Sequence, residues 1–239
     1  MKILMIDTSG PACGVAIVRD GKRVYEAALE TGMTHSQRLM PMVDAALSMS
    51  GMTAQDIDLF GAVVGPGSFT GVRIGVSTVK ALAHAAGKPC VGVDALHALA
   101  MNAVDFDGVI CPILDARAQQ VYGAMFEGGM PPKRLCEDTA EKLAAFLERV
   151  QETGKRALFV GDGVPAYEKA IAEKLGDKAV FAPAQHVGLR AMCAAMLAQH
   201  AADTAQDYIT LLPLYLRAPQ AERERAAKLA AKEEGKANG

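Results

Sequence analysis

Alternating and continuous runs of apolar residues predict three strands at the start of the chain. The runs lie at Ile3–Thr8, Cys13–Arg19 and Arg23–Leu29, and a Ser-Gly-Pro turn and an Asp-Gly pair separate them. Asp-Gly is typical of a tight hairpin, because glycine accepts a positive φ. The pattern therefore predicts an antiparallel meander.

An apolar repeat at helical spacing follows the meander and predicts a helix over residues 36–50. Its apolar positions cover about half of the helix circumference, whereas a stripe of roughly 100° is enough to cover one sheet. These positions are Leu39, Met40, Met42, Val43, Ala46, Leu47 and Met49. Either the methionines fill the protein's own core, or part of this helix is a surface that another protein covers.

A glycine-rich turn between a predicted strand and a predicted helix is the most informative motif. Residues 59–64 are typical of a buried strand, residues 65–75 read Gly-Pro-Gly-Ser-Phe-Thr-Gly-Val-Arg-Ile-Gly, and residues 72–86 repeat at helical spacing. The motif lacks the lysine of a P-loop and the G-x-G-x-x-G spacing of a dinucleotide-binding turn. Its glycines let the backbone approach a ligand closely, or they only let turn and helix pack together.

A second strand that ends in a carboxylate echoes the N-terminus. Asp7 and Asp115 each close an apolar strand and precede a polar turn, and small-residue strands follow at Gly14–Ile17 and Gly123–Phe126. A repeat of this length favours duplicated halves. The remaining predicted elements are strands at 90–93, 109–115 and 157–160, helices at 94–102, 140–150, 165–175 and 189–200, and a segment at 211–216 that packs back on the core.

Composition narrows the possible environments and partners. The 25 basic and 27 acidic residues give a formal net charge of −2, so no overall field attracts nucleic acid or an anionic membrane. The five cysteines are dispersed without a C-x-x-C pair, which favours a reducing compartment, and a cytoplasmic protein is expected. Residues 218–239 are rich in Glu, Arg, Lys and Ala and are predicted to form a solvated, flexible tail.

Several motifs together resemble the TsaB family, also called YeaZ. They are Ile6-Asp-Thr-Ser9, His35-Ser36, the glycine-rich string, Asp115-Ala-Arg117 with Val121-Tyr122, and Pro213-Leu-Tyr-Leu-Arg217. The resemblance implies the α/β fold of actin, Hsp70 and sugar kinases, with two ribonuclease-H-like halves that each contain a mixed sheet and helices. We expect these halves at residues 1–103 and 104–217, before the tail at 218–239.

The resemblance also implies a function in tRNA modification. The protein would be a non-catalytic partner and activator of its paralogue TsaD, which, with the ATPase TsaE, transfers a threonylcarbamoyl group to N6 of the adenosine beside the anticodon. The tRNAs concerned read codons that begin with A. The chain would contact tRNA only through TsaD and would form a homodimer when alone. An ATP-dependent small-molecule kinase and a metallopeptidase-like protein remain alternatives.

A nucleotide-like pocket is expected at the end of the first strand and in the glycine-rich turn. The candidate residues are Asp7, Thr8, Ser9, Gly65, Gly67 and Ser68. The Asp7 carboxylate could hold Mg²⁺ through water, or it could close an Asx turn with its own backbone. We expect no tightly bound cofactor, and ATP or ADP with Mg²⁺ only at or near the TsaD interface.

The partner interface is predicted on the first two helices. Its candidate residues are Met40, Val43, Leu47, Arg73, Val76 and Lys80. By resemblance, the same face serves TsaD docking and self-association.

No metal site and no catalytic residue are predicted. TsaD-like proteins carry two metal-binding histidines one helical turn apart, but here His97 has Met101 at the second position. A metal site needs three or four converging ligands, and the other histidines form no ligand-spaced pair. Cys13 has no nearby base in the sequence and is interpreted as a buried thiol.

Overall fold

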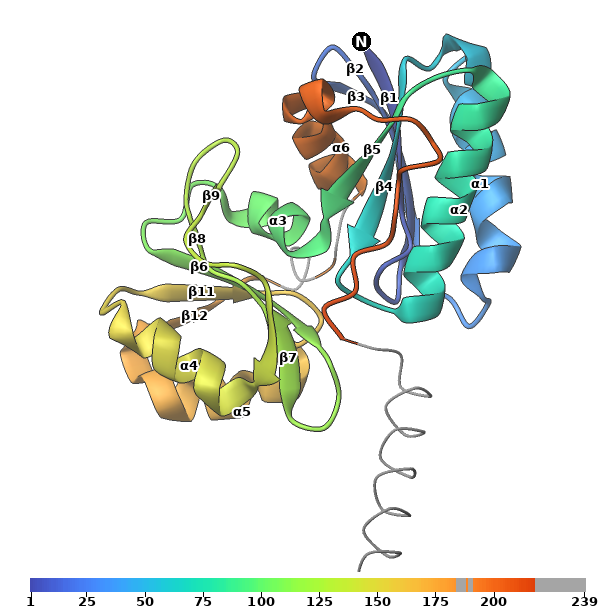
Figure 1. Ribbon diagram of the computed structural model, residues 1–239. Coiled ribbons are helices and arrows are strands. Elements are labelled where there is room, and N and C mark those ends of the chain that lie inside the picture. Colours follow the sequence, from blue (N-terminus) through green and yellow to red (C-terminus); the bar gives the residue numbers. More distant parts are fainter. Residues whose placement is uncertain (184–187, 189–190, 218–239) are drawn as a thin grey trace, which may run out of the picture.

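Two mixed β-sheets form the frame of the computed structural model, which describes residues 1–183, 188 and 191–217 (Figure 1). The first sheet has the order β3-β2-β1-β4-β5 and consists of β1 (Lys2–Asp7), β2 (Cys13–Arg19), β3 (Lys22–Leu29), β4 (Leu59–Gly65) and β5 (Cys90–Asp94). The main path of the second sheet has the order β10-β7-β6-β11-β12 and consists of β6 (Val109–Asp115), β7 (Gln120–Gly123), β10 (Thr139–Lys142), β11 (Ala157–Val160) and β12 (Ala179–Phe181). Two short strands, β8 (Phe126–Glu127) and β9 (Lys133–Arg134), extend it.

The two sheets repeat the same connectivity. In each, three strands pair antiparallel: β1 pairs with β2 and β2 with β3 in the first sheet, and β6 pairs with β7 and β7 with β10 in the second. On the other side of β1 and β6, the strands run parallel. The predicted fold class, two halves that are each a mixed sheet with helices, is therefore confirmed.

Helices make three layers around the sheets. They are α1 (His35–Met49), α2 (Phe69–Ala86), α3 (Ala95–Ala100), α4 (Leu143–Glu152), α5 (Val164–Leu175) and α6 (Ala191–His200). Figure 1 shows α1 and α2 on the outer face of the first sheet and α4 and α5 on the outer face of the second. Single 3₁₀ turns lie at Ala54–Asp56, Met101–Ala103, Gly176–Lys178 and Ala202–Thr204. Among the described residues, no helix has the length and apolar character needed to cross a membrane.

The inner layer joins the two halves through one shared core. This core contains Ile3 of β1, Leu99 of α3 and Ala194 of α6 together with Ile110 of β6 and Val160 of β11, all fully buried. Neither sheet could expose this face to water without uncovering large apolar side chains. The two halves are therefore parts of one packed body.

Residues 191–217 return to the first half, which corrects the predicted domain boundary. Helix α6 packs on β1 and β2, and residues 205–217, which we term the return segment, lie beside β5 and α2. The first half thus consists of residues 1–103 and 191–217, and not of 1–103 alone. Helix α6 is built largely of alanine, so it has no stripe of large apolar residues from which the sheet that it covers could be predicted. The tail at 218–239 lies outside the described residues.

Two further predictions in the second half are wrong in detail. Residues 139–142 form the edge strand β10 against β7, and the predicted helix begins only at Leu143. The predicted strand at Gly123–Phe126 is divided, because β7 ends at Gly123 and β8 begins at Phe126. The other predicted elements agree with the structure to within a few residues, except that Leu189 and Arg190, at the start of the last predicted helix, are not described.

Side-chain caps fix where the site-bearing helices begin. The Ser68 hydroxyl accepts a hydrogen bond from the Gly71 N–H (3.2 Å) at the start of α2. The Asp94 carboxylate accepts one from the His97 N–H (2.7 Å) at the start of α3. Such caps satisfy amide groups that have no partner within the helix.

The shared core predicts that the two halves unfold together. Leu99→Ala in α3 and Leu147→Ala in the outer core of the second half should each lower the free energy of unfolding by about 2–5 kcal/mol, because each leaves a cavity. Urea unfolding followed by circular dichroism and by tyrosine fluorescence should show one common transition for both variants. Two separate transitions, with only one of them shifted by Leu147→Ala, would contradict a shared core.

Candidate functional site

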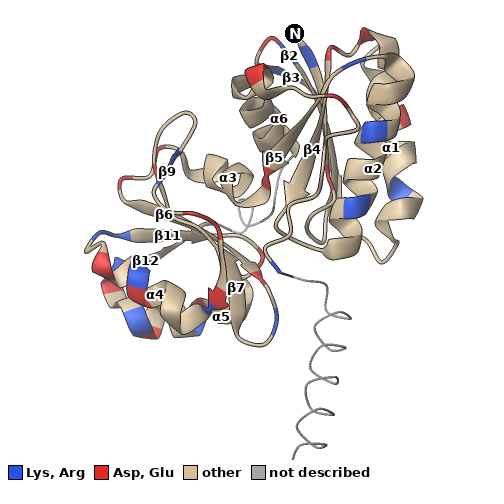
Figure 2. Ribbon diagram, viewed as in Figure 1, with Lys and Arg blue, Asp and Glu red and all other residues tan. Residues whose placement is uncertain are grey.

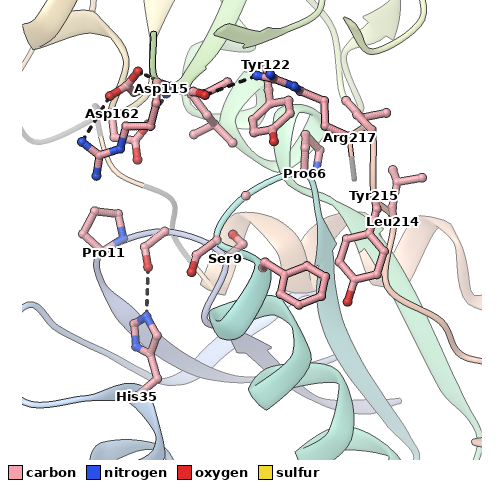
Figure 3. Close-up of a pocket in the computed structure, with 18 residues that line it drawn as sticks. Ser9, Pro11, His35, Pro66, Asp115, Tyr122, Asp162, Leu214, Tyr215 and Arg217 are labelled. Atoms are coloured by element: carbon pink, nitrogen blue, oxygen red, sulfur yellow. Dashed lines mark hydrogen bonds and ion pairs between the residues drawn. The ribbon is translucent and has the colours of Figure 1, made fainter. Parts of the chain in front are cut away.

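A cleft of about 490 Å³ lies between the two halves (Figure 3). The first half contributes the turn after β1, His35 and the glycine-rich loop after β4. The second half contributes the end of β6, Tyr122 and Asp162, and the end of the return segment adds a further wall. The cleft therefore lies where the turns after β1 and β6 meet, as ligand sites often do at the carboxyl ends of strands.

The turn after β1 is held by the carboxylate of Asp7. Its Oδ1 accepts hydrogen bonds from the Ser9 N–H (3.0 Å) and the Ser9 hydroxyl (2.7 Å). Asp7 is only 3% exposed, and burial raises its pKa against the opposing effect of the two Ser9 hydrogen bonds. Of the two interpretations left open by the sequence, this geometry is that of the Asx turn.

The glycine-rich loop packs directly on this turn. The Ser68 N–H donates to the Ser9 carbonyl (2.8 Å), and the Thr8 hydroxyl donates to the Gly71 carbonyl (2.7 Å). A Cβ at Gly67 would lie 2.3 Å from the Ser9 carbonyl oxygen, and one at Gly71 would lie 2.1 Å from that of Thr8. The glycines are therefore required where one backbone touches another.

The six residues of the predicted nucleotide-like pocket divide into those that line the cleft and those that do not. Ser9, Gly67 and Ser68 line the cleft, but Asp7, Thr8 and Gly65 do not. Asp7 is shielded and bonded to Ser9, and the Ser68 N–H is already used inside the protein. Three of the six predicted pocket residues thus line the cleft, and the binding of a nucleotide with Mg²⁺ there stays a prediction.

The second half repeats the arrangement around Asp115. Its Oδ1 accepts hydrogen bonds from the Arg117 N–H (2.9 Å) and the Tyr167 hydroxyl (3.0 Å), while Asp162 Oδ1 accepts one from the Asp115 N–H (3.1 Å). Burial raises the pKa of Asp162, and the negative charge of Asp115 adds to that effect. The sequence analysis did not identify Asp162. It lies in a Gly-Asp-Gly triplet after β11, and this triplet corresponds to the glycine-rich loop after β4 in the first half.

A strained turn at the rim of the cleft carries Arg117. Arg117, Ala118 and Gln119 have φ angles of 65°, 52° and 60°, a region that costs residues with a side chain on the order of 1–3 kcal/mol each. The Leu143 N–H donates to the Gln119 carbonyl (3.0 Å), and β6 and β7 hold the two ends of the turn. The turn leaves the Arg117 side chain in solvent, 3.8 Å from the Asp115 carboxylate.

His97 is part of the packing between α3 and the hairpin of β8 and β9. Its Nε2 lies 2.9 Å from the Pro132 carbonyl oxygen, and its ring stacks on Phe126 with centroids 5.0 Å apart. Burial lowers the pKa of His97, which favours the neutral ring. Within the described residues, no three His, Cys, Asp or Glu side chains are grouped to hold a metal ion, and His186 lies outside them.

Cys13 is fully buried in the core beneath α1. Burial raises the pKa of its thiol, with Arg38 opposing and Asp7 adding to the shift. A protonated, shielded thiol is a poor nucleophile.

The predicted interface residues fall into three groups. Met40 is 50% exposed and Leu47 is half-buried, whereas Val43 and Val76 are buried in the protein's own core and cannot touch a partner, which corrects the prediction for these two. Arg73 and Lys80 are bonded to the return segment.

The methionines of α1 are divided between core and surface. Met42 is buried under the helix, but Met49 is 78% exposed. The core interpretation is thus confirmed for Met42, and the cover of Met40 and Met49 by another protein stays a prediction.

Comparison with known proteins identifies one family. The model of the TsaD family, tRNA N6-adenosine threonylcarbamoyltransferase, matches residues 30–225. A protein of Bacillus subtilis named tRNA threonylcarbamoyladenosine biosynthesis protein TsaB is 36% identical over 93% of this chain and 96% of its own. The Escherichia coli protein of the same name is 35% identical over 81% of this chain and 86% of its own.

A solved structure from Pseudomonas aeruginosa has the same fold over nearly the whole chain. Its title describes an uncharacterized protein with similarity to peptidase YeaZ. The TM-score is 0.76 at 26% identity, covering 90% of this chain and 99% of that one.

The backbone contact at Gly71 predicts a costly substitution. Alanine normally stabilises a helix interior relative to glycine by about 0.5–1 kcal/mol. At Gly71 its Cβ would overlap the Thr8 carbonyl oxygen, so Gly71→Ala should instead lower the free energy of unfolding by more than about 2 kcal/mol. Gly32→Ala, with open space around it, is the control and should change stability little. Equal stability of the two variants in urea titrations would contradict the close packing.

The buried carboxyl of Asp7 predicts a pH-dependent term in stability. Burial raises its pKa in the folded protein above the ordinary aspartate value of 3.8, so the native state holds this proton more tightly than the unfolded chain does. This contribution is fully present below that value and is lost as pH rises through the folded pKa. Asp7→Asn keeps an acceptor for Ser9 but removes the titration.

Urea midpoints measured from about pH 4 to pH 8 should therefore fall more for the wild type than for Asp7→Asn. Asp58→Asn, at the protein surface, serves as the control and should follow the wild type more closely. Parallel curves for wild type and Asp7→Asn would show that burial does not perturb this group.

Proposed function

The chain belongs to the TsaB family of tRNA threonylcarbamoyladenosine biosynthesis proteins, and we propose that it serves there as the non-catalytic partner and activator of TsaD. In this role it forms a heterodimer with TsaD, and TsaE joins them in a ternary complex. The complex transfers the threonylcarbamoyl group to N6 of the adenosine beside the anticodon in tRNAs that read codons beginning with A. The isolated chain has no transferase activity of its own.

The observation that carries the non-catalytic role is the contact between the glycine-rich loop and the turn after β1. The loop's Ser68 N–H is bonded to Ser9, and the Asp7 carboxylate is bonded to Ser9 beneath the surface. These bonds use the Ser68 N–H and the Asp7 Oδ1 inside the protein, which leaves fewer groups for phosphate or Mg²⁺. ATP or ADP with Mg²⁺ therefore binds at or near the TsaD interface and not tightly within this chain.

The outer helices support the partner role. Met40 and Met49 leave apolar surface exposed on α1, and Figure 2 shows few charged residues on α1 and α2. Because the chain matches the TsaD family model, the partner has a related fold with a corresponding helix pair. Two such pairs pack as four helices, and the same face makes a homodimer when TsaD is absent.

The charge distribution supports tRNA contact through TsaD. Figure 2 shows Lys and Arg interspersed with Asp and Glu on α4 and α5, and the net charge of the chain is −2. Phosphate contacts need a concentration of positive charge, which supplies most of the affinity for nucleic acid.

Docking through α1 predicts a specific effect of Met40→Glu. A carboxylate placed in an apolar interface is costly to desolvate, so binding of TsaD should weaken at least about tenfold, or about 1.4 kcal/mol. Met130→Glu, at a methionine of similar exposure in the second half, is the matched control and should bind normally. Isothermal titration would measure both, and equal affinities would rule out docking through α1.

The activator role predicts the outcome of reconstitution. TsaD and TsaE, supplied with ATP and a threonylcarbamoyl donor, should modify tRNA slowly alone and at least about tenfold faster with this chain. The isolated chain should transfer no threonylcarbamoyl group and should not turn over ATP with small-molecule acceptors. Full-speed modification in its absence would contradict the proposal, and robust phosphorylation by the chain alone would favour a kinase.

A further inference from the structure

The return segment forms a third element beside α1 and α2. Gln206 exchanges two backbone hydrogen bonds with Cys90 of β5 (2.8 and 2.9 Å), and the Leu214 N–H donates to the Val64 carbonyl of β4 (2.7 Å). Between these points, Leu211 is buried in the core under α2. Figure 1 shows this orange-to-red segment running alongside β4 and α2.

The two basic side chains of α2 are bonded to the return segment. Lys80 Nζ donates to the carbonyl oxygens of Ile209 and Leu211, each at 3.1 Å. An ammonium group has three donors, so two of its three are used here.

Arg73 is held by an aromatic pair at the other end of the segment. Its Nε donates to the Tyr215 hydroxyl (2.9 Å), and its guanidinium lies 4.2 Å from the centroid of the Phe69 ring. The Phe69 and Tyr215 rings are in contact, with centroids 4.9 Å apart. Tyr215 thereby connects the first turn of α2 to the wall of the cleft.

Held in this way, the segment turns two large apolar side chains outward. Ile209 is 66% exposed and Leu212 is 68% exposed, while Leu211 between them is buried. The Lys80 bonds to the carbonyls of Ile209 and Leu211 fix the backbone that determines this alternation.

We propose that Arg73 and Lys80 are positioning residues for partner docking, which act by holding the return segment against α2. In this arrangement Ile209 and Leu212 extend the docking face of α1 and α2 toward the TsaD-family partner, and the two cations themselves do not bind it. This inference rests on the proposed function, because it assigns further residues to the same docking face.

A double-mutant cycle separates positioning from direct contact. Tyr215→Phe keeps the ring on Phe69 but removes the acceptor of Arg73. If Arg73 acts through Tyr215, then Arg73→Ala, Tyr215→Phe and the double variant should each weaken TsaD binding by a similar factor of about three to ten. If Arg73 touches the partner directly, Tyr215→Phe alone should leave TsaD affinity unchanged. Arg73→Ala should then weaken TsaD binding equally in the wild type and in the Tyr215→Phe variant, and this result would overturn the inference.

The outward side chains provide the second test. Ile209→Ser with Leu212→Ser should weaken binding at least tenfold, because apolar area leaves the interface. Leu135→Ser, at an exposed leucine of the second half, is the matched control. Thermal melts followed by circular dichroism identify any variant that fails to fold. Lys80→Met keeps an apolar stem but loses the bonds to the return segment, so it should weaken TsaD binding while its melt stays like that of the wild type.

The two levels of the proposal fail in different ways. If Met40→Glu abolishes TsaD binding while Ile209→Ser with Leu212→Ser leaves it unchanged, docking through α1 stands and the return segment has no part in it. If Met40→Glu also leaves binding unchanged, the docking face itself is wrong.

Discussion

The contact between the turn after β1 and the glycine-rich loop is the constraint on which the site depends. Two stretches of backbone meet there without intervening side chains, because a Cβ at Gly67 or Gly71 would overlap a carbonyl oxygen. That contact determines where α2 begins and therefore where its outer face points. It also uses the Ser68 N–H and the Thr8 hydroxyl in hydrogen bonds within the protein. One packing contact thus sets both the course of the loop beside the cleft and the direction of α2.

The shared core gives the same architecture a second physical consequence. Helices α3 and α6 lie between the sheets and bury apolar side chains from both of them. A rotation of one half against the other would have to separate these contacts, at a cost proportional to the apolar area exposed. The fold therefore favours a fixed relative position of the two halves.

Most of the first half could be predicted from the sequence, because β1, β2 and β4 are continuous apolar runs and its helices have recognisable caps such as Asp94. Edge strand β10 could not, since Thr139–Lys142 is polar and becomes a strand only through pairing with β7. The glycine-rich motif identified the loop of the cleft from the sequence. No local pattern indicates that the Asp7 side chain is buried. The partners of Lys80 and Arg73 lie 129 and 142 residues away in the chain, beyond any local pattern.

The return of residues 191–217 to the first half bears on how the polypeptide is made. Strands β1 and β2 are synthesised before any other strand that the structure describes, but α6, which covers one of their faces, follows the whole second sheet in the chain. Until α6 has been synthesised, this apolar face of β1 and β2 has no helix over it, although the second sheet is already complete in sequence. Domains usually fold as units during synthesis, N-terminal first, but the first half of this protein cannot be completed until α6 has been synthesised.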